Sequence, residues 1–102
     1  MIVQNKDQVL REIKTRRADL RQFGVRRLGL FGSFVREEQS TESDLDFLVE
    51  FEPNEKTFNN YMDLAFFLED LFERKVDLLT TESPSPFIGP RILDEVEYDI
   101  TG

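Results

Sequence analysis

Two aspartates and a Gly-Ser pair are the residues of this sequence best suited to chemistry. A single residue separates Asp44 from Asp46, and ten residues separate Gly32-Ser33 from Asp44. In a strand, residues two apart point to the same face, so both carboxylates would lie together. Neighbouring carboxylates repel each other unless a cation lies between them, and Mg²⁺ typically binds one or two carboxylates together with substrate phosphates. The pattern therefore indicates chemistry on a nucleoside triphosphate.

Three further residues could contribute to this site. Asp77 lies in a later apolar segment, where it is either a third metal ligand or an ordinary exposed residue. Arg36 comes one helical turn after the Gly-Ser pair, so it could reach a triphosphate or form a salt bridge with one of the two glutamates that follow it. Ser43, next to the first aspartate, could bind nucleotide or bond only to nearby backbone.

Hydrophobic periodicity predicts the elements that must position these residues. Helices are predicted where apolar side chains recur at helical spacing, at residues 6–23, 57–73 and 87–96. Strands are predicted from short apolar segments, at residues 26–31, 45–51, 75–80 and 96–100. Gly24 is placed to end the first helix, and Ser33 could begin a short one. The order predicts a single α/β domain over residues 1–102, with helices flanking a small mixed β-sheet.

Composition excludes several classes of function. The 102 residues include no Cys and no His, which removes disulfides, thiolate zinc sites and the usual general base. The formal net charge of −8 argues against direct nucleic-acid binding, which needs clustered Lys and Arg. The N-terminus lacks an apolar signal core, and no run of about 18 apolar residues exists. We therefore expect a cytoplasmic protein without a membrane span.

Taken together, Gly32-Ser33 and the Asp44-Leu45-Asp46 motif resemble the signature of the nucleotidyltransferase superfamily that includes DNA polymerase beta. The closest resemblance is to the minimal nucleotidyltransferases, which are encoded beside a helical HEPN-type partner. One departure is Glu37, since many relatives have glycine after the arginine of this motif.

This resemblance implies an activity and a set of site residues. The implied activity is transfer of AMP from ATP to a hydroxyl, in particular of Tyr, on a HEPN-type toxin, as the antitoxin of a type VII pair. Two Mg²⁺ ions would be held by the three catalytic carboxylates, Asp44, Asp46 and Asp77. The nucleotide would be bound by Gly32, Ser33, Arg36 and Ser43.

Two other functions remain open from the sequence. The chain could be an antitoxin that blocks its partner by stoichiometric binding without catalysis. It could also transfer nucleotide to a small molecule such as an aminoglycoside. The intact set of motif residues favours a catalytic function over binding alone.

Overall fold

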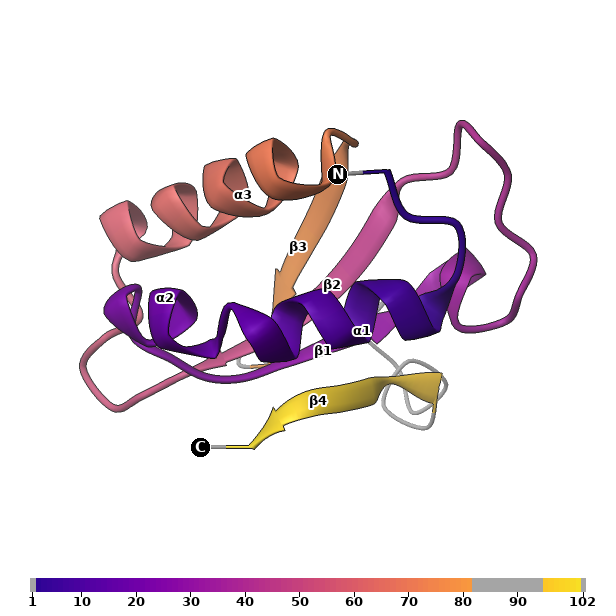
Figure 1. The fold of residues 1–102 in the computed structure, drawn as a ribbon. Helices are drawn as coiled ribbons and strands as arrows, with labels where there is room; N and C mark the ends of the chain where they lie inside the picture. The colour runs from indigo at the N-terminus through magenta and orange to yellow at the C-terminus, as the bar shows by residue number, and fades with distance from the viewer. Residues whose placement is uncertain (1, 82–94, 102) are drawn as a thin grey trace.

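The computed structural model describes residues 2–81 and 95–101 (Figure 1). Its elements are, in chain order, α1 (Lys6–Thr15), α2 (Arg17–Gln22), β1 (Val25–Phe31), the 3-10 turn η1 (Gly32–Phe34), β2 (Leu45–Phe51), α3 (Phe58–Phe72), β3 (Val76–Thr80) and β4 (Glu97–Thr101). The predicted strands and the predicted helix at 57–73 all appear within a residue of their expected bounds. The predicted helix at 87–96 lies, apart from its last two positions, outside the described residues.

The first predicted helix, at 6–23, is two helices in the structure. Arg16 interrupts it with backbone angles of φ −94° and ψ 18°, and its N–H is shared between the carbonyls of Glu12 and Ile13. The apolar periodicity continues through this irregular turn, which explains why the sequence pattern did not reveal it. Gly24 follows α2 at φ +76°, a left-handed conformation that glycine adopts readily, so the prediction that it ends this helical segment is confirmed.

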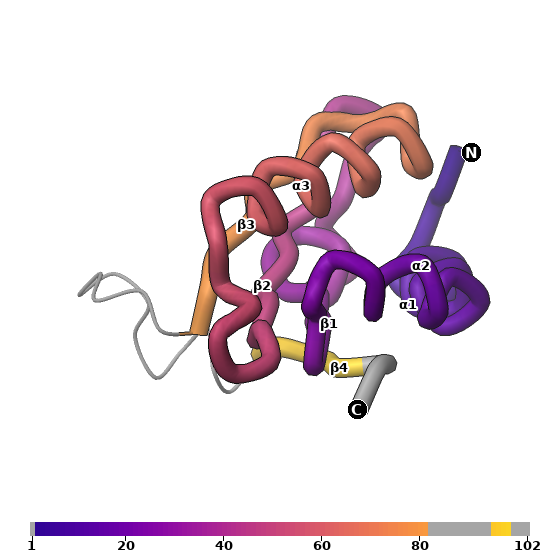
Figure 2. Tube along the Cα trace, turned by 90° about the vertical axis from the view of Figure 1, so that its left-hand side faces the viewer, coloured from indigo at the N-terminus to yellow at the C-terminus, as the bar shows by residue number. Residues whose placement is uncertain are grey.

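Four strands form one mixed sheet in the order β3-β2-β1-β4. Strand β1 pairs antiparallel with both β2 and β4, whereas β2 and β3 run parallel. All three helices pack on one face of this sheet, as the view along its edge shows (Figure 2). The predicted α/β architecture of helices on a small mixed sheet is therefore confirmed.

The hydrophobic core lies between the helices and the sheet. Alternate residues of the two central strands enter it, including Leu28, Leu30, Leu45, Phe47 and Val49. The helices contribute Val9, Ile13, Leu20, Leu64, Leu68 and Phe72. A shift of one residue along β2 would move its whole apolar set out of the core, so packing fixes the register of that strand. The residues that alternate with this set, Asp46 and Glu50 among them, consequently face away from the helices.

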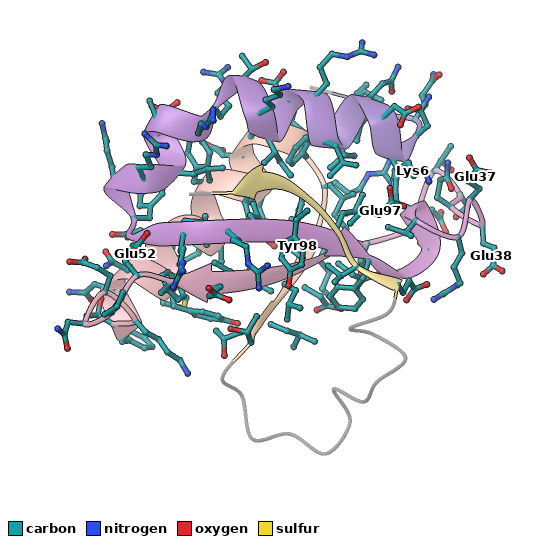
Figure 3. All side chains as sticks on the ribbon, turned by 90° about the horizontal axis from the view of Figure 1, so that it is seen from below. Lys6, Glu37, Glu38, Glu52, Glu97 and Tyr98 are labelled. Carbon is teal, nitrogen blue, oxygen red and sulfur yellow. The ribbon has the colours of Figure 1, made fainter. Side chains whose placement is uncertain are left out.

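Two polar contacts attach outer elements to the sheet. Lys6 at the start of α1 reaches Glu97 of β4, with Nζ and Oε2 3.0 Å apart (Figure 3). The Tyr61 hydroxyl on α3 donates to the Leu78 carbonyl of β3 at 2.5 Å. Among the described residues, no helix is both long and apolar enough to span a membrane.

Candidate active site

The sheet register brings two of the predicted carboxylates side by side. Strands β2 and β3 run parallel, and Asp46 is the register partner of Asp77. Register partners on adjacent strands project from the same face, which here is the face away from the helices. Asp46 is half-buried and Asp77 is exposed. Asp44 lies just before β2, is half-buried, and is close enough to Asp46 to affect its ionisation.

Gly32 lies directly against the Asp46 carboxylate. Phe31, the last residue of β1, is the register partner of Asp46, so the Gly-Ser corner begins beside this aspartate. Gly32 has φ +79°, and a Cβ on it would lie 2.9 Å from Asp46 Cγ and still closer to Oδ2. A side chain at this position would therefore displace the carboxylate as well as strain the backbone. Only glycine allows η1 and the aspartate to approach this closely.

The site carries uncompensated negative charge. The pKa of Asp46 is raised to about 6, first by burial and then by the neighbouring Asp77 and Asp44 carboxylates. Arg36 opposes this effect, while Glu95 adds to it. Negative charges close to a partly desolvated carboxylate disfavour its ionisation. A bound cation would relieve this repulsion.

The donor set fits a hard divalent ion that is also bound by phosphate oxygens. Within residues 2–81 and 95–101, no three His, Cys, Asp or Glu side chains form a group that could hold a metal ion by themselves. Mg²⁺ rarely uses such an all-protein cage, because it keeps several waters and is bound by one or two carboxylates plus substrate phosphates. The adjacent Asp46 and Asp77 side chains, with Asp44 nearby, supply oxygen ligands of this kind.

Of the two interactions expected for Arg36, a contact with triphosphate or a salt bridge with a following glutamate, the structure contains the salt bridge. Its Nε lies 3.0 Å from Glu38 Oε2, and its Nη1 lies 2.8 Å from Glu95 Oε1. Figure 3 shows Glu37 and Glu38 on the loop after η1, at the same end of the sheet as Glu97. Glu37 has φ 59°, a left-handed conformation that glycine adopts more easily.

The two serines have different surroundings. Ser33 is half-buried at the second position of η1, directly after the glycine corner. The Ser43 hydroxyl oxygen accepts a hydrogen bond from the Ser40 N–H at 2.8 Å, which is the local backbone bond that the sequence left open. Contacts of either serine with nucleotide remain predictions.

Sequence reasoning missed two residues near the site. Glu95 pairs with Arg36 from 59 positions away, a separation that no local pattern reveals. Arg74 was not singled out either, yet its Nη1 donates to the Ser43 carbonyl at 2.6 Å. Arg74 also lines a cavity of about 830 Å³ that extends from Asp44 to the N-terminal segment and the end of α3.

The chain is similar in sequence to known nucleotidyltransferases. Residues 10–99 match the family model of the nucleotidyltransferase domain. The protein adenylyltransferase MntA of Thermococcus cleftensis is 41% identical over 76 residues, covering 74% of this chain and 76% of the relative. A Methanocaldococcus jannaschii protein, described as a proposed protein adenylyltransferase, is 38% identical over 78 residues, covering 74% and 78% of the two chains.

Solved structures share the fold. A proposed minimal nucleotidyltransferase superposes with a TM-score of 0.68 at 30% identity, covering 86% of this chain and 93% of the other. A chain from a tri-AMPylated Shewanella oneidensis HEPN toxin in complex with MNT antitoxin gives a TM-score of 0.64 at 18% identity, covering 91% and 73%. The second likeness concerns the fold alone.

Proposed function

This chain belongs to the nucleotidyltransferase domain family, and on that premise we propose that it transfers AMP from ATP to a hydroxyl group of a HEPN-type partner protein. The observation that carries the proposal is the contact of the Gly32 corner with Asp46, which is itself in register with Asp77. This arrangement places backbone suited to phosphate directly beside carboxylates suited to a divalent ion. A protein acceptor is supported by the T. cleftensis relative, which is named a protein adenylyltransferase.

Each site residue has a defined role in this proposal. The triphosphate would rest on the Gly32 backbone and the Ser33 hydroxyl, with Ser43 and Arg36 contacting it from the adjoining loop. Asp44, Asp46 and Asp77 would hold two Mg²⁺ ions. When bound, these ions would neutralise developing phosphate charge and lower the pKa of the acceptor hydroxyl.

The transfer is an in-line displacement at the α-phosphorus. The acceptor oxygen forms a bond to this phosphorus while the bond to the bridging oxygen of the β-phosphate breaks. Pyrophosphate leaves with the electron pair of that bond. The proton of the acceptor hydroxyl passes to Asp77, the exposed member of the carboxylate set. The product is an AMP group joined to the acceptor by a phosphodiester bond.

We further propose a Tyr side chain of the partner as the acceptor and an antitoxin of a type VII pair, acting in the cytoplasm, as the biological role. A structural neighbour comes from a complex of tri-AMPylated HEPN toxin with MNT antitoxin, which supports this pairing. Modification of a toxin by AMP would silence it covalently, so one copy of this chain could act on many copies of its partner.

Intact mass spectrometry of the HEPN-type protein encoded beside this chain tests the proposal. We expect the partner to gain mass in AMP units when incubated with ATP, Mg²⁺ and the wild-type chain. Asp46→Asn removes one charge from the carboxylate set, and we expect transfer to fall by at least about 100-fold with the fold retained. Asp63→Asn, at an exposed position of α3, is the matched control and should transfer like the wild type.

Three outcomes would contradict the proposal. A stable complex without added mass would indicate an antitoxin that acts by stoichiometric binding. Pyrophosphate release with an aminoglycoside and no protein acceptor would indicate a small-molecule nucleotidyltransferase. Full transfer by Asp46→Asn would show that the carboxylate set is not the reaction centre.

A further inference from the structure

Arg74 joins three parts of the chain through backbone carbonyls. It lies just after α3, following Glu73, which ends the helix in a left-handed conformation. Its Nη1 donates to the Ser43 carbonyl at 2.6 Å and to the Ser40 carbonyl at 3.3 Å, while Nη2 reaches the Val3 carbonyl at 3.4 Å. A single guanidinium therefore attaches the end of α3 to the loop before Asp44 and to the N-terminal segment.

The same guanidinium also contacts the turn that follows the glycine corner. Its carbon lies 5.1 Å from the ring centroid of Phe34, which is 1% exposed and is the last residue of η1. The turn itself begins at Gly32, which lies against the Asp46 carboxylate. Arg74 thus touches both structures that must meet at the site, the loop leading into Asp44 and the phosphate-facing turn.

These contacts need the particular shape of arginine. Its planar fork directs several N–H groups along fixed lines and stacks on an aromatic ring, whereas a lysine ammonium is a compact charge on a flexible stem. No ion pair of Arg74 with a carboxylate occurs among residues 2–81 and 95–101, so its hydrogen bonds to protein go to carbonyls. Such bonds fix the direction of the loop backbone rather than neutralise a charge.

We propose that Arg74 is a positioning residue for nucleotidyl transfer. By holding residues 40–43 against η1, it sets where Asp44 stands relative to the Gly32 corner. The expected effect of Arg74 on the rate of transfer rests on the proposed function. The contacts that Arg74 makes do not depend on that function. The cavity beside Asp44 shares this wall, since Arg74, Phe34 and Val3 all line it.

Arg27 offers a matched control elsewhere in the sheet. Its guanidinium also lies over an aromatic ring, 4.3 Å from the centroid of Tyr98. Its Nη2 is paired with Glu50 at 2.9 Å instead of with carbonyls of the site loop. Figure 3 shows Tyr98 near the middle of the sheet, away from the Glu37 and Glu38 loop. Arg27→Lys should therefore weaken a similar contact without touching the site.

The test compares Arg74→Lys with Arg27→Lys in the full chain by two readouts. The first readout is hydrogen exchange without nucleotide at the amides of Ser43 and Leu45. The Ser43 amide donates to the Ser40 carbonyl at 3.2 Å, and the Leu45 amide donates to the Lys75 carbonyl at 3.0 Å. We expect exchange at residues 40–45 to rise about tenfold in Arg74→Lys alone. The second is transfer to the HEPN-type partner, where we expect kcat to fall about 10- to 100-fold, with a higher Mg²⁺ requirement, in Arg74→Lys alone.

The possible results separate this inference from the proposed function. Faster exchange with unchanged kinetics and Mg²⁺ requirement would show a purely structural role and overturn the inference, as would wild-type behaviour in both readouts. If the wild type transfers nothing, the proposed function fails, and calorimetric binding of AMP-PNP with Mg²⁺ decides the role of Arg74. A loss of about tenfold in affinity confined to Arg74→Lys supports it, and equal affinity overturns it. Should Arg74→Lys not fold, Arg74→Gln, which keeps a planar amide donor, replaces it.

Discussion

Asp46 and Glu50 lie on the same strand and the same face, yet their surroundings are opposite. The negative charge of Glu50 is compensated by two arginines, because Arg26 Nε lies 3.4 Å from one of its oxygens and Arg27 Nη2 lies 2.9 Å from the other. Asp46 instead stands beside Asp77, and its pKa is raised to about 6. The carboxylate at one end of β2 is thus paired with arginines, while the carboxylate at the other end stands beside a second carboxylate, and a bound cation would relieve the repulsion between them.

Two glycines at the ends of β1 show the same difference. Gly24 and Gly32 have nearly equal φ angles of +76° and +79°. A Cβ on Gly24 would lie 2.5 Å from the Cβ of Glu55, so this glycine serves close packing at a turn. A Cβ on Gly32 would meet the Asp46 carboxylate. Both positions have a backbone conformation that favours glycine. Only at Gly32 would an added side chain also displace a carboxylate of the site.

Gly32→Ala, at one end of β1, should reduce AMP transfer far more than Gly24→Ala at the other end. The new methyl group would displace the Asp46 carboxylate, and a misplacement of about 1 Å can cost about 100-fold in rate. We expect transfer of AMP to the partner to fall by about 100-fold, measured by intact mass against time. The free energy of unfolding should also fall, by about 1–3 kcal/mol, because alanine is strained at this φ angle.

Gly24→Ala is the control for that experiment. It should lose a similar 1–3 kcal/mol of unfolding free energy in urea titrations, because its φ angle and its crowding are similar. Its transfer rate below the unfolding transition should match the wild type. Equal loss of transfer in both variants would mean that Gly32 acts through stability alone.

The difference in charge between the surroundings of Asp46 and Glu50 predicts how the stability of the metal-free protein depends on pH. The pKa of Asp46 is raised from 3.8 to about 6, first by burial and then by Asp77 and Asp44. The folded carboxyl keeps its proton to higher pH than the unfolded one, so its stabilising effect is present below pH 4 and is lost as pH rises through 6. Asp46→Asn should therefore be more stable than the wild type at pH 7.5 in EDTA, by about 1 kcal/mol after allowance for solvent screening.

Urea titrations of both proteins at pH 4 and pH 7.5 measure this effect. The advantage of Asp46→Asn should shrink at pH 4, where the wild-type carboxyl is protonated. Asp63→Asn, with an exposed side chain on α3, controls for general loss of negative charge. An Asp46→Asn variant that is less stable than the wild type at pH 7.5 would show that the aspartate is already compensated.

Glu95→Gln should give the smallest effect. Removing its charge weakens the 2.8 Å contact with Arg36 and frees that guanidinium for nucleotide phosphates. Partly exposed ion pairs contribute about 0–1 kcal/mol, so we expect the KM for ATP to fall by about two- to fivefold. Glu52→Gln, at the opposite end of the sheet in Figure 3, is the control. A higher KM in Glu95→Gln would show that the pair instead holds Arg36 in place for the nucleotide.

Local patterns were enough to predict most of the fold. The strand at 45–51 and the helix at 57–73 follow from alternation and helical periodicity, since both elements bury an apolar face. The grouping of Asp46 with Asp77 was implied by the family resemblance, because the residues alone left Asp77 open between a metal ligand and an exposed residue; the sheet register sets the two side by side. What the periodicity could not show was the interruption at Arg16, where the same apolar spacing continues through a turn.

The contacts that shape the site were beyond sequence reasoning. Glu95 and Arg74 reach it from elements distant in sequence, and a charged residue gives no periodic signal of its partner. The likeness of Gly24 and Gly32 was equally hidden, because a glycine in the sequence does not reveal which side chain its missing Cβ would touch. Such information exists only once the sheet register is known.

The order of strands in the sheet has a consequence for folding. The site draws on β1, β2 and β3, which are neighbours in the sheet and lie within residues 25–80. Strand β4 closes the other edge of β1 much later, with Arg27 paired to Thr101, 74 positions further along the chain. Closing so long a loop carries a larger entropic cost than the pairings within 25–80. We therefore expect the reaction centre to assemble early, before β4 is added, and to do so during synthesis as well.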